Sequence, residues 1–172
     1  MKLSRRNPPS LRILAAVLLG LTLAGAAGDE PPREGTFEGD WALSGTARPV
    51  EVGSATVVLA RLEGPVTLRS AGGLARKFDA VCNSVSDQKT GGVGRCTWTD
   101  EAGDTLLLEL SGTILGPAGT VREARGSVIG GTGRYAAVEG EFRVDWLFVD
   151  SVLDDERFKG YVSKLEGHWK RP

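Results

Sequence analysis

The chain has 172 residues, of which 41% are hydrophobic, and its formal net charge is −1. A chain of this length forms one domain with a substantial core. Because phosphate contacts need a basic surface, the charge argues against nucleic acid as a partner.

Residues 1–26 have the pattern of a secretory signal peptide. Basic residues precede the apolar run Ile13–Ala27, and Ala24-Gly25-Ala26 supplies a small-x-small cleavage pattern. The run is shorter than the about 20 apolar residues of a membrane span, although an uncleaved anchor is the alternative. Cleavage leaves 17 Lys and Arg against 22 Asp and Glu, a formal net charge of −5. We expect a secreted or periplasmic protein without a stable membrane span or a lipid-anchor cysteine, with a polar leader at 27–34 and one domain at 35–172.

The first part of that domain has the period of β-strands. Phe37, Trp41 and Leu43 alternate with polar residues, which predicts a half-buried strand with Trp41 as a core plug or a ligand-stacking wall. Two β-prone runs follow, Ala55–Leu62 and Val66–Arg69. The Glu63-Gly64-Pro65 segment between them predicts either a turn or a bulge.

The two cysteines lie on a predicted hairpin. Its strands, Arg76–Ser86 and Val93–Asp100, flank a polar loop centred on Lys89. Antiparallel pairing about that centre places Cys82 opposite Cys96, and an exported chain favours a disulfide between them. A catalytic thiol or a redox pair is the alternative, but the spacing is not C-x-x-C.

Later strands carry most of the aromatic residues. Asp100–Asp104 predicts a hairpin turn rather than a calcium loop, and strands are predicted at Thr105–Gly112, Val121–Ile129, Glu141–Val149 and Phe158–Leu165. Phe142, Trp146 and Phe148 share one face, and Trp98 has the inward parity of Cys96. Aromatic side chains on an inward face indicate either a cavity wall or an ordinary packed core. The candidate cavity residues are Trp98, Phe142, Trp146 and Phe148.

Acidic residues on the predicted strands are the candidates for chemistry. A carboxylate that faced a dry interior would have a raised pKa and could be functional, whereas an outward one would be surface charge. The single histidine, His168, lies near the terminus, which argues against a Ser-His-Asp or Cys-His mechanism. His and Cys clusters are missing, so we predict no metal site and no cofactor. The inward-carboxylate candidates are Glu109, Glu123, Glu141 and Asp145.

A glycine-rich stretch separates two of the predicted strands. The sequence Gly-Gly-Thr-Gly follows Val121–Ile129 directly, and it predicts a structural corner with one helical turn at Tyr135–Val138. A phosphate cradle is the alternative, but the third glycine of G-x-G-x-x-G and the Lys-Ser of a P-loop are missing. The candidate corner residues are Gly130, Gly131, Thr132, Gly133, Tyr135 and Gly140.

The same stretch carries a family resemblance. The sequence GGTGRYAAVEGEF resembles the GGTG-[FY]-x-x-x-x-G segment of the allene oxide cyclase and dirigent barrel superfamily. The upstream sequence CNSVSDQKTGGVGRCTWTDEAGDTLLLELSG is similar to small bacterial exported proteins that share this barrel. The resemblance covers roughly Phe78 to Val149. It implies a barrel with an apolar interior, which in allene oxide cyclases binds a fatty-acid epoxide and shapes its cyclisation.

The whole pattern predicts an all-β fold, an antiparallel barrel of eight or nine strands, of the allene oxide cyclase type, with almost no helix. The leading functional hypothesis is an exported barrel that binds a small apolar molecule. One alternative is an isomerase or cyclase of the allene oxide cyclase type. The other is a structural barrel that packs its interior and associates with copies of itself.

Overall fold

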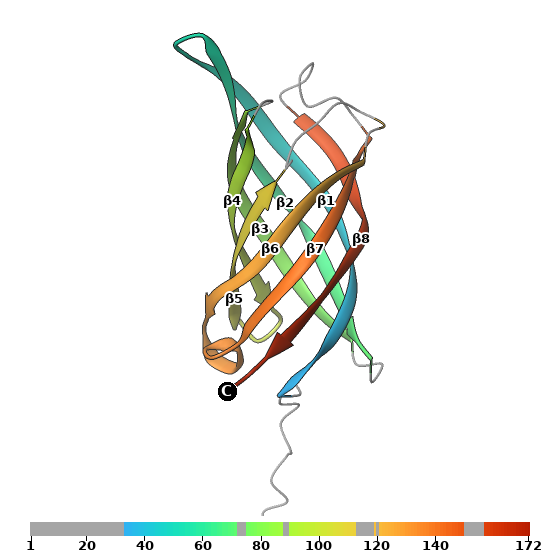
Figure 1. Cartoon of the computed structure of the whole chain (residues 1–172). Helices are drawn as coiled ribbons and strands as arrows, with labels where there is room; N and C mark the ends of the chain where they lie inside the picture. The colour runs from blue at the N-terminus through green and yellow to red at the C-terminus, as the bar shows by residue number, and fades with distance from the viewer. Residues whose placement is uncertain (1–32, 72–74, 88–89, 113–118, 120, 150–156) are drawn as a thin grey trace, which may run out of the picture.

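The protein is a closed barrel of eight antiparallel strands, seen here in a computed structural model that describes residues 33–71, 75–87, 90–112, 119, 121–149 and 157–172 (Figure 1). Each strand pairs with its neighbours along the chain, and β1 pairs with β8 to close the barrel. The all-β barrel class predicted from the sequence is confirmed, with eight strands. They are β1 (Glu34–Val52), β2 (Ala55–Ser70), β3 (Ala75–Asp87), β4 (Gly91–Asp100), β5 (Thr105–Gly112), β6 (Val121–Gly131), β7 (Glu139–Phe148) and β8 (Arg157–Lys170).

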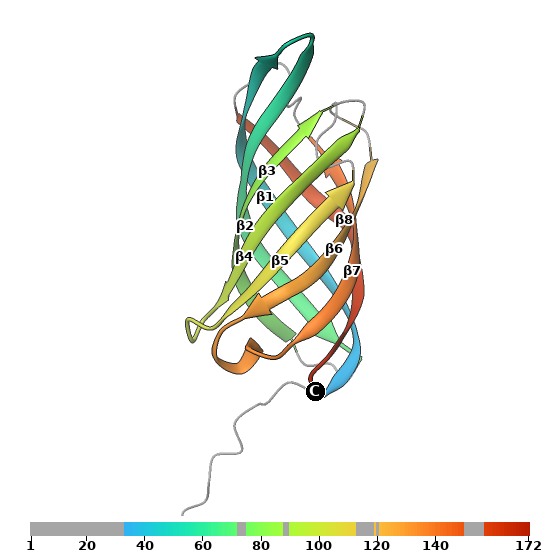
Figure 2. The ribbon, with the colours of Figure 1, turned by 60° about the vertical axis from the view of Figure 1, so that its left-hand side comes forward.

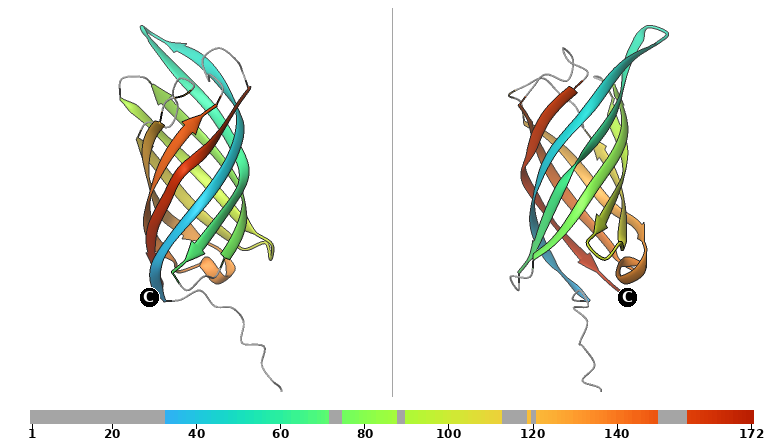
Figure 3. Two further views of the ribbon diagram at one scale, coloured as in Figure 1. Left: turned by 90° about the vertical axis from the view of Figure 1, so that its right-hand side faces the viewer. Right: turned by 180° about the vertical axis from the view of Figure 1, so that it is seen from behind.

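The barrel has two distinct ends. The lower end in Figure 1 holds the start of β1, the end of β8 and the glycine-rich corner, whereas the upper end holds the β1–β2 hairpin. Figures 2 and 3 show that this hairpin projects beyond the other strands. The pairing explains this, because β1 pairs with β8 only as far as Thr46 but pairs with β2 up to Val52.

Alternation of side chains fills the barrel with apolar groups. On β1, Phe37, Trp41 and Leu43 are buried, and the residues of opposite parity between them, Glu38, Asp40 and Ala42, are exposed. Glycines on inward positions make room for large rings. A Cβ at Gly126 would lie 2.0 Å from Cζ of Phe142 on β7. The narrow interior of an eight-stranded barrel is therefore packed by rings set against glycines.

Strand β2 is continuous where the sequence predicted a turn or a bulge. It runs from Ala55 to Ser70, and the register with β1 is the same at Val66 and at Glu63, on either side of Gly64. Gly64 has φ +149°, and a Cβ there would lie 2.0 Å from the carbonyl oxygen of Ala42. The glycine lets β1 approach closely without ending the strand.

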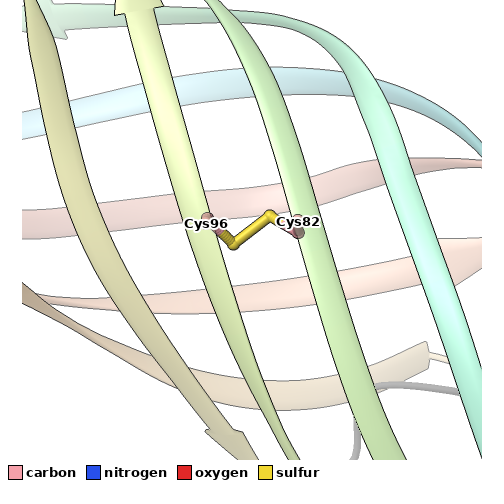
Figure 4. Close-up of a disulfide and its surroundings, with 2 residues drawn as sticks. All are labelled: Cys82 and Cys96. Carbon is pink, nitrogen blue, oxygen red and sulfur yellow. A yellow bond between two sulfur atoms is a disulfide. The ribbon is translucent and has the colours of Figure 1, made fainter.

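The predicted disulfide is confirmed. Cys82 on β3 and Cys96 on β4 are directly opposed and bonded, and both are buried inside the barrel (Figure 4). The hairpin centre at Lys89, taken from the sequence, gives this register directly.

Strand β8 is longer than predicted. It continues past Leu165 to Lys170, which places Trp169 inside the lower end and leaves His168 exposed. The predicted signal peptide at 1–26 lies outside the described residues. In the described part of the chain, no helix has the length and apolar character to cross a membrane.

Candidate functional site

The aromatic residues proposed to line a cavity form a packed cluster. Trp98, Phe142, Trp146 and Phe148 all face inward, and none is more than 6% exposed. Trp41 connects them, with ring centroids 5.6 Å from Trp98 and 5.0 Å from Trp146. Phe142 packs on Trp98 at 5.7 Å. Phe148 packs on Phe158 instead, with ring centroids 5.8 Å apart. This part of the interior is therefore an aromatic core.

The indole groups of this core keep their hydrogen-bond donors unpaired. The Nε1 atoms of Trp41, Trp98, Trp146 and Trp169 are buried and have no hydrogen-bond partner. Buried tryptophans normally find an acceptor for this N–H, and leaving it unpaired costs free energy. The packed core therefore carries four indole N–H groups without an acceptor among the described residues.

The upper end of the barrel combines small side chains with a further unpaired group. Ser84 on β3 is 8% exposed, and its Oγ is buried without a partner. Its neighbours across the sheet are Ala60 on β2 and Gly94 on β4, and neither has a polar side chain that could pair with the hydroxyl. Ser86, the next inward position of β3, is buried as well.

An arginine faces the interior from another wall of the same end. Arg122 is the first inward position of β6, since it shares its parity with the buried Ala124 and Gly126. It lies opposite Trp146, whose ring is fully buried. The Arg122 Nε is buried and unpaired, and within the described residues Arg122 forms no ion pair. We call Arg122, Ser84 and the small residues Ala60 and Gly94 the upper site.

The four candidate carboxylates lie on the outer face of the barrel. Glu109 pairs with Arg95 at 2.6 Å, and Arg143 pairs with both Glu123 at 3.1 Å and Asp145 at 3.0 Å. The fourth, Glu141, is exposed on β7. Glu109, Glu123 and Glu141 border an open groove of about 510 Å³ across β5–β8. Among the described residues, no three His, Cys, Asp or Glu side chains gather in a way that could hold a metal ion.

The glycine-rich stretch forms the connection between β6 and β7. Its helical turn is a 3₁₀ turn at Gly133–Tyr135, two residues earlier than expected. Gly133 has φ +52°, and a Cβ there would lie 1.8 Å from Oδ1 of Asp104. Thr132 extends the pairing of the strands, since its N–H donates to the Thr105 carbonyl at 2.8 Å. Glycine is needed where the chain turns against the Asp104 carboxylate.

The other glycines of the corner allow close approach of the backbone. A Cβ at Gly131 would lie 2.6 Å from the carbonyl oxygen of Tyr135, and one at Gly140 would lie 2.6 Å from that of His168. Gly130 lies beside a bulge, because the register between β5 and β6 shifts at Leu107 and Leu108.

Four side chains lock this corner to the neighbouring turn, and we call them the corner clasp: Asp100, Asp104, Arg134 and Tyr135. The Arg134 backbone N–H and Nε both donate to Oδ2 of Asp104, at 3.2 and 3.0 Å. The Tyr135 hydroxyl donates to Oδ2 of Asp100 at 3.0 Å. Burial raises the pKa of Tyr135, and the hydrogen bond to Asp100 raises this pKa further. The Asp104 carboxylate therefore already accepts from the Arg134 backbone N–H, which a bound phosphate would need as a donor.

Comparison with known proteins adds a likeness of fold. No protein-family model matches the chain, and no curated protein matches it. Among solved structures, the chain is similar to the pterocarpan synthase dirigent protein GePTS1. The identity is 15%, the match covers 83% of this chain and 89% of that chain, and the TM-score is 0.46. The allene oxide cyclase assignment from the sequence stays a prediction.

Sequence reasoning did not find the upper site. The signal was present, because Ser84 and Ser86 have the inward parity of Cys82, and Arg122 has the parity of Ala124 and Gly126. An inward polar residue on an otherwise apolar face is the pattern that reveals such a site. The candidates chosen from the sequence were instead the aromatic and acidic residues of the strands.

Proposed function

We propose that the protein binds a small, mostly apolar molecule inside the upper end of its barrel. The observation that carries this proposal is the set of buried, unpaired polar groups there, above all Ser84 Oγ and Arg122 Nε. Native interiors leave few such groups unpaired, because each costs about 1–3 kcal/mol. A ligand with an acceptor atom would pair them, while its apolar body would pack on Phe148 and Phe158.

Binding without catalysis is the form of this proposal that the side chains favour. An isomerase or cyclase that moves protons needs an acid or base facing its substrate. Glu109, Glu123 and Asp145 face outward and are engaged with arginines. Asp100, whose side chain is 8% exposed, is held by Tyr135 in the corner clasp. We therefore place a carrier or sensor role ahead of the cyclase reaction implied by the sequence resemblance.

Export to an oxidising compartment is part of the same proposal. The basic and apolar pattern of residues 1–26 supports a signal peptide, and the buried Cys82–Cys96 disulfide suits a secreted or periplasmic protein.

A neutral apolar probe tests the binding proposal. N-phenyl-1-naphthylamine fluoresces when it leaves water, so its titration into the native protein reports an accessible apolar site. We expect saturable binding with Kd on the order of 100 μM or tighter. The variant Ala60→Phe, which places a ring beside Ser84, should weaken this binding about tenfold or more by filling the site.

The matched control is Leu59→Phe, because Leu59 is 48% exposed and faces outward on the same strand. This control should bind the probe like the natural sequence. Urea unfolding of both variants shows whether the barrel is intact. Absence of saturable binding in the natural protein, or equal binding by an intact Ala60→Phe variant, would reject the upper site in favour of a packed structural barrel.

A further inference from the structure

We infer that Arg122 and Ser84 together recognise an anionic group on the ligand, so that the preferred ligand class is a small organic acid with an apolar body. This inference rests on the proposed function, and it adds the chemistry of the ligand's polar end.

The position of Arg122 is what makes this inference specific. Its side chain leaves β6 toward the interior beside Trp146, and its Nε is buried without a partner. A guanidinium presents a planar set of donors that matches a carboxylate or a sulfonate in a bidentate way. Arg122 is half-buried and its Nε is shielded from solvent without a partner, so an anionic ligand group would supply the acceptor that this N–H lacks.

Ser84 supplies a second donor toward the same end. It is the second-to-last inward residue of β3, as Arg122 is the first of β6, so both lie close to the upper rim. The residues paired with it, Ala60 and Gly94, carry no polar side chain that could bond its hydroxyl. The described acids near this rim are used elsewhere, since Asp87 accepts from Thr90 and Glu51 accepts from Thr56 at 2.9 Å. The described interior of this end thus has donors from two walls.

A matched pair of probes separates this inference from the proposed function. The compound 8-anilinonaphthalene-1-sulfonate has the ring system of N-phenyl-1-naphthylamine with one sulfonate added. We expect the native protein to bind the sulfonate probe about tenfold or more tightly than the neutral probe. Both probes are measured by fluorescence titration at the same ionic strength.

Two variants test whether Arg122 and Ser84 cause the preference for the sulfonate probe. Arg122→Gln should lower the affinity for the sulfonate probe about tenfold or more and change that for the neutral probe less than about twofold. Ser84→Ala should act in the same direction with a smaller effect. The control is Arg125→Gln, because Arg125 is exposed on the outer face of the same strand and carries the same charge.

Each outcome decides the matter. Loss of the sulfonate preference in Arg122→Gln but not in Arg125→Gln supports the inference. If the native protein binds both probes equally, or if an intact Arg122→Gln variant keeps the preference, the inference is wrong while the proposed function stands. If neither probe binds, the proposed function fails and the inference fails with it.

Discussion

At the scale of single residues, Tyr135 shows how the glycine-rich corner is fixed. Its ring is fully buried against Phe78, with centroids 5.6 Å apart, and its hydroxyl reaches Asp100. The corner therefore depends on one phenol that is both a core side chain and a hydrogen-bond donor. This dual role makes the state of the phenol proton part of the stability of the fold.

Stability should fall at alkaline pH because of this phenol. The pKa of Tyr135 is raised in the folded protein, so the native state keeps a proton that the unfolded chain loses. Its contribution is complete below about pH 10, the ordinary pKa of tyrosine, and is lost as the pH rises above that value. Urea unfolding at pH 8 to pH 11 should show a steeper loss in the natural protein than in Tyr135→Phe.

The same variant should be less stable at neutral pH. Tyr135→Phe removes the hydrogen bond to Asp100, and we expect the free energy of unfolding at pH 7 to fall by about 1–2 kcal/mol. Tyr161→Phe is the control, because Tyr161 is 46% exposed. Identical pH profiles for the two variants would show that the clasp does not carry the alkaline transition.

At the scale of elements, the strands are joined by contacts that only glycine permits. Gly126 on β6 faces the ring of Phe142 on β7, and Gly167 on β8 lies against Cβ of Phe142 and the ring of Phe37. We expect Gly126→Ala to lower the free energy of unfolding by about 1–3 kcal/mol through overpacking. Gly35→Ala should be tolerated, because its Cβ would meet only Trp169 Nε1, at 3.9 Å.

A double variant tests the cause of that loss. Phe142→Leu costs stability by itself, but it should partly rescue Gly126→Ala, because the shortened side chain frees the space that the new methyl group needs. Double-mutant analysis of urea unfolding measures this coupling. Strict additivity of the two changes would contradict the ring-against-glycine arrangement.

The disulfide constrains the hairpin of β3 and β4. Cys82 and Cys96 join β3 to β4 across 14 residues, and closing such a loop stabilises a fold by about 3 kcal/mol. We expect the double variant Cys82→Ala with Cys96→Ala to unfold at correspondingly lower urea. Reductant should destabilise the natural protein and leave the double variant unchanged. If the double variant is as stable as the natural protein without reductant, the disulfide contributes no stability.

Sequence reasoning succeeded where a local period or symmetry sets the structure. Cross-strand symmetry about Lys89 gives the Cys82–Cys96 pairing, and the period of two gives the inward face of β7. It failed where distant strands decide the outcome. Gly64 does not end β2. Because it has no side chain, the backbone of Ala42 on β1 can approach it closely. The upper site also depends on β3 and β6 meeting the same interior, which spacing along the chain does not reveal.

At the scale of the whole molecule, the two ends of the barrel differ in the side chains that fill them. The lower end is closed by aromatic packing, with Trp169 against Phe37 at 5.5 Å, and by the corner clasp. The upper end combines small inward side chains with unpaired donors from β3 and β6. A packed lower end and a polar upper end suit a barrel that holds its ligand at one rim.

The indole N–H signals of the isotope-labelled protein test this account most directly. The chain has four tryptophans, so four indole signals are expected in a nitrogen–proton correlation spectrum. Single Trp→Phe variants assign them. Adding 8-anilinonaphthalene-1-sulfonate should shift the signal of Trp146, beside Arg122, and leave that of Trp169 at the lower end unchanged. A bound probe that shifts no indole signal, or that shifts Trp169 alone, would contradict ligand binding at the upper end of the barrel.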